Sequence, residues 1–306
     1  MMDRLTKLTT ESQNSKSLNL DMMTTEEMLQ LMNEEDQSVP FAINESLPEI
    51  VKTVDFVYES FMNEGRLFYV GAGTSGRIGL LDAVECPPTF STSSEKVQAL
   101  LAGGPGAMMV AVEGAEDDED LGAQDLKDKN LTSDDVVIGI AASGRTPYVK
   151  GALKYARSIG AKAVSLSSNK DSEISESADV AIEIVTGPEV LTGSTRLKAA
   201  TAHKMVLNMI STASMVKYGK VYQNLMVDVS ASNFKLRERA KKIVCEATGT
   251  TYEEAEQVLE QTDCEVKPAI VMILAEVDFQ TARELLEKAD GFVREAIKNK
   301  TNIADK

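Results

Sequence analysis

The feature that most constrains the fold is an apolar run that breaks at a glycine-rich turn and resumes with helical spacing. The apolar run covers residues 67–70, and the turn Gly-Ala-Gly-Thr-Ser-Gly covers residues 71–76. Residues 78–83 then predict a helix, which we expect Pro87 and Pro88 to end. In a strand–turn–helix unit, the N–H groups of the turn and the helix N-terminus point at one spot, where an anion can bind.

Four further runs of mainly apolar residues predict a parallel sheet. Strands that are apolar on both faces are typical of sheets covered by helices on both sides. The runs occupy residues 97–101, 136–141, 163–166 and 180–185. A helical pattern over residues 148–159 separates two of them. We therefore expect an α/β three-layer sandwich around a parallel sheet of about five strands.

The predicted sheet domain lies between an N-terminal arm and a C-terminal helical region. We predict an arm with its helices over residues 1–54, the sheet domain over 55–220 and helices over 221–306. A threonine followed by a glutamate at capping-box spacing starts one helix at residues 24–27. A second helix is expected to follow Pro40 and run to about residue 62. The C-terminal region predicts a small helical bundle, and its A-T-G-x-x-x-E-E-A-E pattern resembles ubiquitin-associated modules.

The charge balance argues against several classes of partner. The chain has 32 basic and 48 acidic residues, a formal net charge of −16, which disfavours nucleic acid and anionic membranes as partners. No apolar run reaches the roughly 18 residues that a membrane span needs, and the polar N-terminus does not predict a secretory signal. We therefore expect a cytoplasmic protein that binds neither nucleic acid nor a membrane.

The histidine and cysteine content narrows the chemistry further. His203 is the only histidine, which argues against multi-histidine metal sites and against Ser-His or Cys-His catalysis. Cys86, Cys245 and Cys264 are scattered and predict neither a zinc site nor a disulfide framework. General acid–base chemistry would then fall mainly to carboxylates or lysines. We leave His203 out of the predicted site and interpret Cys86 as a packing residue.

Three short loops share one pattern of hydroxyl, glycine and arginine residues. They cover residues 74–77, 142–145 and 193–196, and each is expected to follow a strand and open a helix. One such Ser or Thr alone is most often a helix N-cap. Three of them at the carboxyl ends of parallel strands favour a cradle for one phosphate.

The first of these loops also matches the dinucleotide pattern G-x-G-x-x-G through Gly71, Gly73 and Gly76. That pattern needs an acidic residue at the end of the next strand, to hold a ribose hydroxyl. The next predicted strand runs instead into Ala-Gly-Gly-Pro at residues 102–105. We therefore predict a monophosphate ligand and no nicotinamide or flavin cofactor.

Two groups of acidic residues are candidates for acid–base chemistry. Glu85 stands just before the double proline, and Glu113 and Glu116 stand in V-E-G-A-E-D. A run of acidic residues follows Glu116, and such runs are usually solvated. Spacing alone does not choose between Glu113 and Glu116.

Several long motifs together resemble the N-acetylmuramic acid 6-phosphate etherases, a family with the SIS (sugar isomerase) fold. The motifs are G-A-G-T-S-G-R-x-G-x-L-D-A-x-E-C-P-P-T, V-E-G-A-E-D, G-I-A-A-S-G-R-T-P-Y-V and T-G-S-T-R-x-K-A-x-T-A. The resemblance starts at T-E-S-Q-N near the N-terminus and extends into the helical tail. It implies a carbon–oxygen lyase of cell-wall sugar recycling. That enzyme removes the D-lactyl ether at carbon 3 of the sugar phosphate and uses no metal or other cofactor.

The resemblance also implies roles for individual residues. Glu85 would be the general acid that protonates the departing lactate, and Glu116 the general base that removes the proton on carbon 2. The implied phosphate and sugar contacts come from the three loops. They are Ser75, Ser143 and Thr146 for the phosphate, Ser194 for the sugar, and Gly73, Thr74 and Gly144 for loop shape and N–H donors.

Two other functions fit parts of the pattern. A sugar phosphate isomerase of the same fold also needs a base at carbon 2, but it has no use for a second carboxylic acid at carbon 3. A non-catalytic sugar-phosphate sensor would resemble the glucokinase regulatory proteins, which contain two SIS halves where this chain accounts for one. Because SIS sites commonly lie at subunit interfaces, we expect a homodimer with active sites at its interface.

Overall fold

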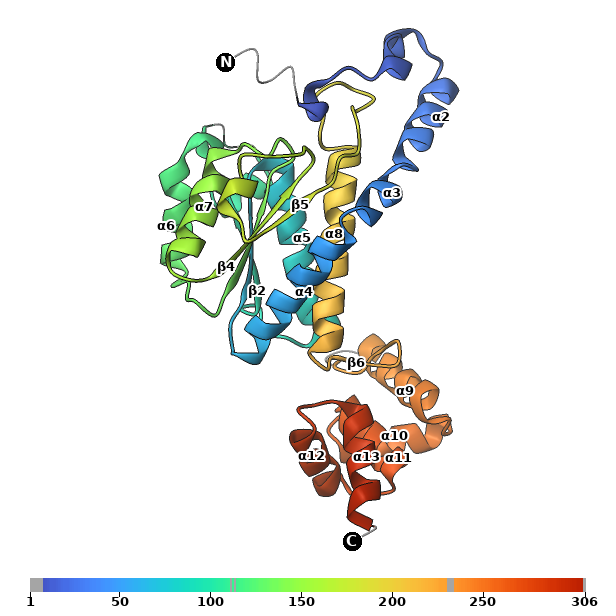
Figure 1. Ribbon diagram of the computed structural model, residues 1–306. Helices are drawn as coiled ribbons and strands as arrows, with labels where there is room; N and C mark the ends of the chain where they lie inside the picture. The colour runs from blue at the N-terminus through green and yellow to red at the C-terminus, as the bar shows by residue number, and fades with distance from the viewer. Residues whose placement is uncertain (1–7, 111, 113, 230–233, 305–306) are drawn as a thin grey trace. The chain divides into compact units, whose positions relative to one another are not determined.

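The computed structural model describes residues 8–110, 112, 114–229 and 234–304 of the chain, which fall into two units. The units are Met1–Val84 with Ser94–Thr212, and Glu85–Ser93 with Ala213–Lys306. Figure 1 labels helices and strands of both units. The predicted domain boundaries after residues 54 and 220 stay predictions.

The first unit contains a five-stranded sheet in the order β2-β1-β3-β4-β5. All neighbouring strands are parallel, and Leu67 is opposite both Val97 and Val136. Every residue of β1 and β3 is buried, as expected of strands covered on both faces. The strands are β1 Leu67–Gly71, β2 Val97–Leu101, β3 Val136–Ile140, β4 Lys162–Ser167 and β5 Val180–Glu183. The predicted parallel sheet is confirmed.

Helices cover both faces of this sheet, so the predicted three-layer sandwich is also confirmed. Helix α7 (Pro147–Ser158) packs against β3 and β4, and α6 (Glu119–Asp128) packs against α7. Figure 1 shows α4 (Leu47–Met62), α5 (Gly73–Phe90) and α8 (Lys198–Lys217) across the sheet from them.

Alternating side chains of β1 pack on opposite faces of the sheet. Phe68 and Val70 join the apolar core formed with α7, whereas Tyr69 lies under α5, where a Cβ added to Gly79 would come 2.8 Å from the Tyr69 Cβ. The glycine at position 79 therefore lets α5 approach the sheet closely.

The double proline does not end α5 where the sequence predicted. The helix continues to Phe90 with Pro87 and Pro88 inside it. Proline lacks an N–H, so the carbonyls of Ala83 and Val84 lose their usual helical donors. Both prolines lie near the helix end, and the N–H of Ser91, the residue just after the helix, donates to the Pro87 carbonyl at 2.9 Å. The chain thus keeps helical geometry for one turn more than expected.

The N-terminal helices follow the predicted start signals but not the predicted lengths. Helix α2 (Thr25–Asp36) has a complete capping box between Thr24 and Glu27. The single helix expected after Pro40 is two helices, α3 (Val39–Asn44) and α4. Pro48 lies in the first turn of α4, where the N–H that proline lacks would have no helical acceptor. In the interior of one continuous helix, Pro48 would remove a backbone hydrogen bond and break the helix.

The remaining elements of the first unit are short 3₁₀ turns. The turns are η1 Thr9–Glu11, η2 Ser15–Ser17, η3 Leu20–Met22, η4 Pro105–Met108, η5 Ala115–Asp117 and η6 Ser175–Ser177.

The second unit is mainly helical, and the predicted C-terminal helical bundle is confirmed. A short antiparallel pair, β6 Val221–Tyr222 and β7 Leu225–Met226, precedes the helices. The helices are α9 Phe234–Thr248, α10 Tyr252–Gln261, α11 Val266–Ala275, α12 Phe279–Lys288 and α13 Val293–Ala304. They share an apolar core in which Ile270 and Val271 of α11 are fully buried. Among the helices that the structure describes, none combines the length and apolarity of a membrane span.

Candidate functional site

The strand order creates a crevice at the carboxyl ends of β1 and β3. These strands are neighbours, and the helices that follow them, α5 and α7, cover opposite faces of the sheet (Figure 1). Loops that diverge in this way open a ligand site in parallel α/β sheets. A cavity of about 210 Å³ lies there, and its wall includes Ala72 and Gly73 after β1 and Ala141 to Ser143 after β3.

The loop after β1 folds tightly into the first turn of α5. Gly73, with φ +54°, is the first residue of the helix, so the residues predicted as a loop before the helix belong to its first turn. A Cβ at Gly71 would come 2.7 Å from the Gly76 nitrogen. Thr74 and Ser75 line the cavity, and the free N–H groups of a helix N-terminus favour an anion.

The loop after β3 supplies the second set of hydroxyls. Ser143 and Thr146 line the same cavity, and Thr146 directly precedes α7. Gly144 has φ +72°, and a Cβ there would come 2.3 Å from the Ser172 Cβ. Gly144 therefore shapes the turn without being part of the cavity wall.

The third loop contributes a different residue from the one expected. Thr195, not Ser194, is part of the cavity wall, together with Ala200 and His203 from α8. Gly193, with φ +76°, turns the chain just before it. The sequence predicted the sugar contact at Ser194, whereas the next residue, Thr195, lines the cavity.

Two of the three loop arginines are engaged elsewhere in the first unit. The Arg77 guanidinium donates to the carbonyls of Ala107 and Met108, at 2.9 and 3.2 Å. Arg145 forms an ion pair with Glu173 at 2.9 Å. The donors at the cavity wall next to these arginines are hydroxyls and backbone N–H groups.

Glu116 is the carboxylate that the structure brings to this cavity. It lies in η5 and also lines two adjoining cavities, of about 630 Å³ and about 120 Å³. Glu116 therefore stands where the three spaces meet. The alternative candidate Glu113 lies outside the described residues.

Glu85 is not brought to the same cavity. It lies on α5 twelve residues after Gly73, which is about 18 Å along a helix axis. Its side chain is exposed, and it does not line the cavity that holds Glu116.

His203 was left out of the predicted site, yet it lines the cavity. The side chain is fully buried, its Nε2 lies 3.0 Å from Ser168 Oγ, and its Nδ1 has no hydrogen-bond partner among the described residues. Burial lowers the His203 pKa to about 4, against a raising effect of the Ser167 backbone. The ring is neutral at neutral pH. Its place on the helix that follows the third loop could have indicated it.

Glu11 is a second residue of the cavity wall that the sequence analysis gave no role. It comes from η1 in the N-terminal arm and lines both the 210 Å³ and the 630 Å³ cavities. Its only sequence signal is the T-E-S-Q-N motif in which it stands.

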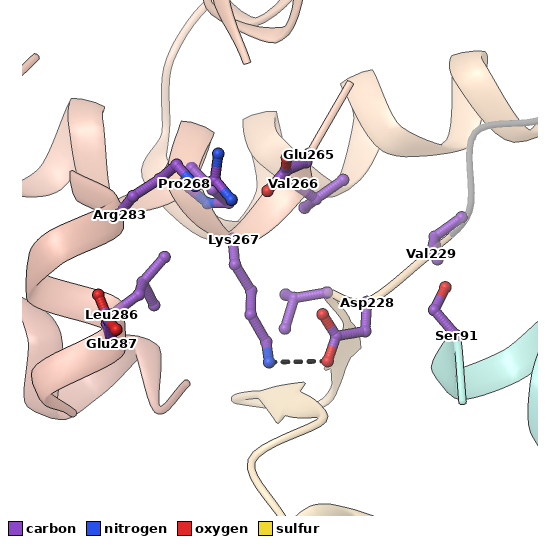
Figure 2. Close-up of a pocket in the computed structure, with 11 residues that line it drawn as sticks. Ser91, Asp228, Val229, Glu265, Val266, Lys267, Pro268, Arg283, Leu286 and Glu287 are labelled. Carbon is purple, nitrogen blue, oxygen red and sulfur yellow. Dashed lines mark ion pairs between the residues drawn. The ribbon is translucent and has the colours of Figure 1, made fainter. Parts of the chain in front are cut away.

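A larger cavity of about 510 Å³ lies within the second unit (Figure 2). Its central cation, Lys267, forms an ion pair with Asp228 at 2.7 Å, and burial lowers the Lys267 pKa while Asp228 opposes that change. Glu265 and Glu287 add two carboxylates to the wall, against one further cationic side chain, Arg283. The neutralised lysine and the extra carboxylates do not make an anion site, so we place the candidate site in the first unit.

The first-unit cavity thus combines the parts that a phosphorylated substrate and acid–base chemistry require. Hydroxyls and a helix N-terminus can bind a phosphate without a cationic side chain. A carboxylate beside them can accept a proton from the bound molecule.

Two family models match this chain. Residues 49–157 match the family model of the glucokinase regulatory protein N-terminal SIS domain, and residues 114–213 match the SIS domain. The phosphoheptose isomerase structure from Neisseria gonorrhoeae is 16% identical, with a TM-score of 0.48, over 62% of this chain and 97% of that chain.

Similarity to two named relatives extends along nearly the whole chain. An N-acetylmuramic acid 6-phosphate etherase from Geobacillus sp. (strain WCH70) is 59% identical over 96% of this chain and 99% of that protein. The protein of the same name from Bacillus subtilis (strain 168) is 55% identical over 96% of this chain and 97% of that protein.

Proposed function

The chain belongs to the family of N-acetylmuramic acid 6-phosphate etherases, and we propose that it cleaves the D-lactyl ether of N-acetylmuramate 6-phosphate with water. The products are N-acetylglucosamine 6-phosphate and D-lactate, which makes the chain a carbon–oxygen lyase of cell-wall sugar recycling. The observation that carries the proposal is Glu116 in one cavity wall with Ser75, Ser143 and Thr146.

We propose that the phosphate binds the hydroxyls of Ser75, Ser143 and Thr146 and the N-terminus of α5. The short loops after β1 and β3 support this assignment, because they hold these hydroxyls around one cavity. Gly73 and Gly144 adopt positive φ angles that shape the two loops. Thr74 adds a further hydroxyl, and Ser194 stays a proposed sugar contact beside Thr195.

The proposed reaction is an elimination followed by a hydration of the open-chain sugar. The Glu116 carboxylate removes the carbon-2 proton, which the carbon-1 aldehyde acidifies. The carbon 3–oxygen bond breaks, and Glu85 as a carboxylic acid protonates the departing lactyl oxygen. Water then adds to carbon 3 of the unsaturated aldehyde, giving its proton to Glu85, while Glu116 returns a proton to carbon 2. Both glutamates end in their starting protonation states.

We propose a homodimer in which Glu85 serves the active site of the partner subunit. The position of Glu85, about three turns along α5 from Gly73, supports this. Large apolar side chains exposed on helices of one sheet face also favour a partner there. They are Leu47 and Val51 of α4, Leu81 and Val84 of α5 and Met209 of α8.

We also propose that the protein works in the cytoplasm. The phosphate of a sugar phosphate is charged, and it would have to lose its hydration water to cross a bilayer unaided. That loss is energetically costly. The enzyme is therefore expected in the compartment where its substrate is phosphorylated.

Variants of the two glutamates test both the function and the division of roles. With purified protein and N-acetylmuramate 6-phosphate, Glu85→Gln and Glu116→Gln should each lower D-lactate release by at least about 100-fold. In deuterated water, Glu85→Gln should still exchange the carbon-2 proton of N-acetylglucosamine 6-phosphate, because Glu116 remains. Glu116→Gln should not exchange it.

Glu119→Gln is the matched control, because Glu119 is a nearby acidic residue outside the wall of the 210 Å³ cavity. It should leave both measurements near the wild-type values. Normal lactate release by Glu85→Gln would refute the acid role. A wild-type protein that binds the sugar phosphate but releases no lactate would instead favour the sensor.

A further inference from the structure

We propose that Glu11 is a specificity-determining residue that accepts a hydrogen bond from an N–H or O–H group of the sugar. This inference rests on the proposed function and adds a third carboxylate to the site. Its basis is an anchored N-terminal arm that carries an unpartnered carboxylate in the cavity wall.

The arm is fixed on the N-terminal side of Glu11 by one buried amide. The Thr9 N–H donates to Asn169 Oδ1 at 2.8 Å, and Asn169 Nδ2 donates to Thr10 Oγ1 at 3.1 Å. The Thr10 and Asn169 side chains are both nearly inaccessible to solvent. These contacts fix the backbone immediately before Glu11.

The same amide connects the arm to the loop after β3. Asn169 Nδ2 also lies 3.1 Å from the Ala142 carbonyl and 3.3 Å from the Ser143 carbonyl. Because Ser143 is a proposed phosphate contact, Asn169 holds the arm in register with the phosphate-binding loop. The position of Glu11 relative to the bound phosphate is therefore defined.

The arm is fixed again on the C-terminal side of Glu11. The Asn14 side chain donates to Glu35 Oε2 at 2.9 Å and to the Pro188 carbonyl at 3.3 Å. Glu35 is in turn paired with Lys198 of α8 at 2.6 Å. Both ends of the short segment that holds Glu11 are thus attached to the first unit.

The Glu11 carboxylate itself has no hydrogen bond or ion pair with any residue that the structure describes. It lines the same cavity as Ser75, Ser143 and Glu116. A carboxylate repels a phosphate, so its favourable ligand contact is with the neutral N–H or O–H donors of the sugar. A charge-assisted hydrogen bond of this kind stabilises a complex more than a neutral one.

A binding comparison separates this role from a general effect on the site. We would titrate wild type, Glu11→Ala and Glu11→Gln with N-acetylglucosamine 6-phosphate and, separately, with inorganic phosphate. Glu11→Ala should weaken sugar phosphate binding by about 10-fold or more, and Glu11→Gln should weaken it less because the amide oxygen still accepts. Binding of inorganic phosphate should be unchanged or tighter.

The exposed Glu45→Ala is the matched control and should bind both ligands as wild type does. Unchanged sugar phosphate binding by Glu11→Ala would overturn the proposal, and so would an equal loss for inorganic phosphate. Steady-state kinetics should show the Glu11→Ala effect mainly in KM. The binding comparison needs no turnover, so it tests Glu11 even if the wild-type protein releases no lactate.

Discussion

At the scale of single residues, His203 shows why a buried polar group can lie in a ligand cavity and still stay uncharged. The imidazole is fully buried, and only Nε2 has a hydrogen-bond partner, Ser168 Oγ, among the described residues. Burial disfavours the imidazolium, so the folded protein holds the proton more weakly than the unfolded chain does. The ring therefore contributes a neutral surface to the cavity wall.

The lowered pKa of His203 predicts a pH-dependent contribution to stability, which the substitution His203→Gln should remove. The His203 pKa is about 4 in the folded protein, against 6.5 for the free side chain. The unfolded state therefore binds more protons between these values, and stability is lost as pH falls from about 6.5 towards 4. Urea unfolding should show that His203→Gln loses about 2 kcal/mol less than wild type between pH 7 and pH 4.5. Equal losses would contradict the buried neutral ring.

Local sequence patterns predicted the cavity residues that lie in the short loops immediately after strands. Gly73, Thr74, Ser75 and Ser143 follow strands directly, and parallel strands bring their carboxyl ends to one edge. The places of Glu11 and His203 depend instead on contacts between distant segments, such as that from Thr9 to Asn169. The sequence around Glu11 or His203 does not show which distant segment each contacts, so both residues were left without a role.

At the scale of elements, Glu35 joins the N-terminal arm to two helices. It lies on α2, pairs with Lys198 of α8 and accepts a hydrogen bond from Asn14 of the arm. Burial opposes ionisation of Glu35, but Lys198 and Lys16 hold its pKa at about 2. The charged form is therefore maintained at all pH values at which the protein is expected to work.

Removal of this charge should destabilise the first unit. The Lys198 side chain is only 3% exposed, so Glu35→Gln leaves a buried ammonium without its carboxylate and should cost about 3 kcal/mol. The neighbouring Glu34→Gln, at an exposed position, should cost less than about 0.5 kcal/mol. Urea unfolding of the two variants checks the difference, and similar midpoints would contradict the role of Glu35.

Element boundaries were predictable where a single residue decides them. The capping box at Thr24 and Glu27 marked the start of α2, and the strand predicted over residues 97–101 coincides with β2. Pro87 and Pro88 misled the prediction, because α5 continues to Phe90 with both prolines inside it.

At the scale of the whole molecule, the proposed homodimer supplies each active site with residues of two subunits. One chain carries both glutamates, but only Glu116 lines the first-unit cavity. A two-fold dimer places each subunit's residues in the same relation to its partner. In the proposed dimer, Glu85 of each site comes from the second copy.

Mixing two inactive variants tests this arrangement. Glu85→Gln and Glu116→Gln subunits, unfolded and refolded together, should form mixed dimers with one intact site. At random pairing the mixture should recover about a quarter of wild-type activity. A mixture as inactive as its components, with subunit exchange verified by mass, would place both glutamates of a working site in one chain.

The most direct test of the proposed function follows the oxygen atom that water contributes. N-acetylmuramate 6-phosphate would be incubated with the protein in oxygen-18 water with a chelator present. The aldehyde oxygen exchanges with water by itself, so the product would be returned to ordinary water before mass analysis to remove label from that position. We predict D-lactate release with one heavy oxygen at carbon 3 of N-acetylglucosamine 6-phosphate. Lactate release without label in the sugar would mean cleavage on the lactyl side and would contradict elimination and hydration.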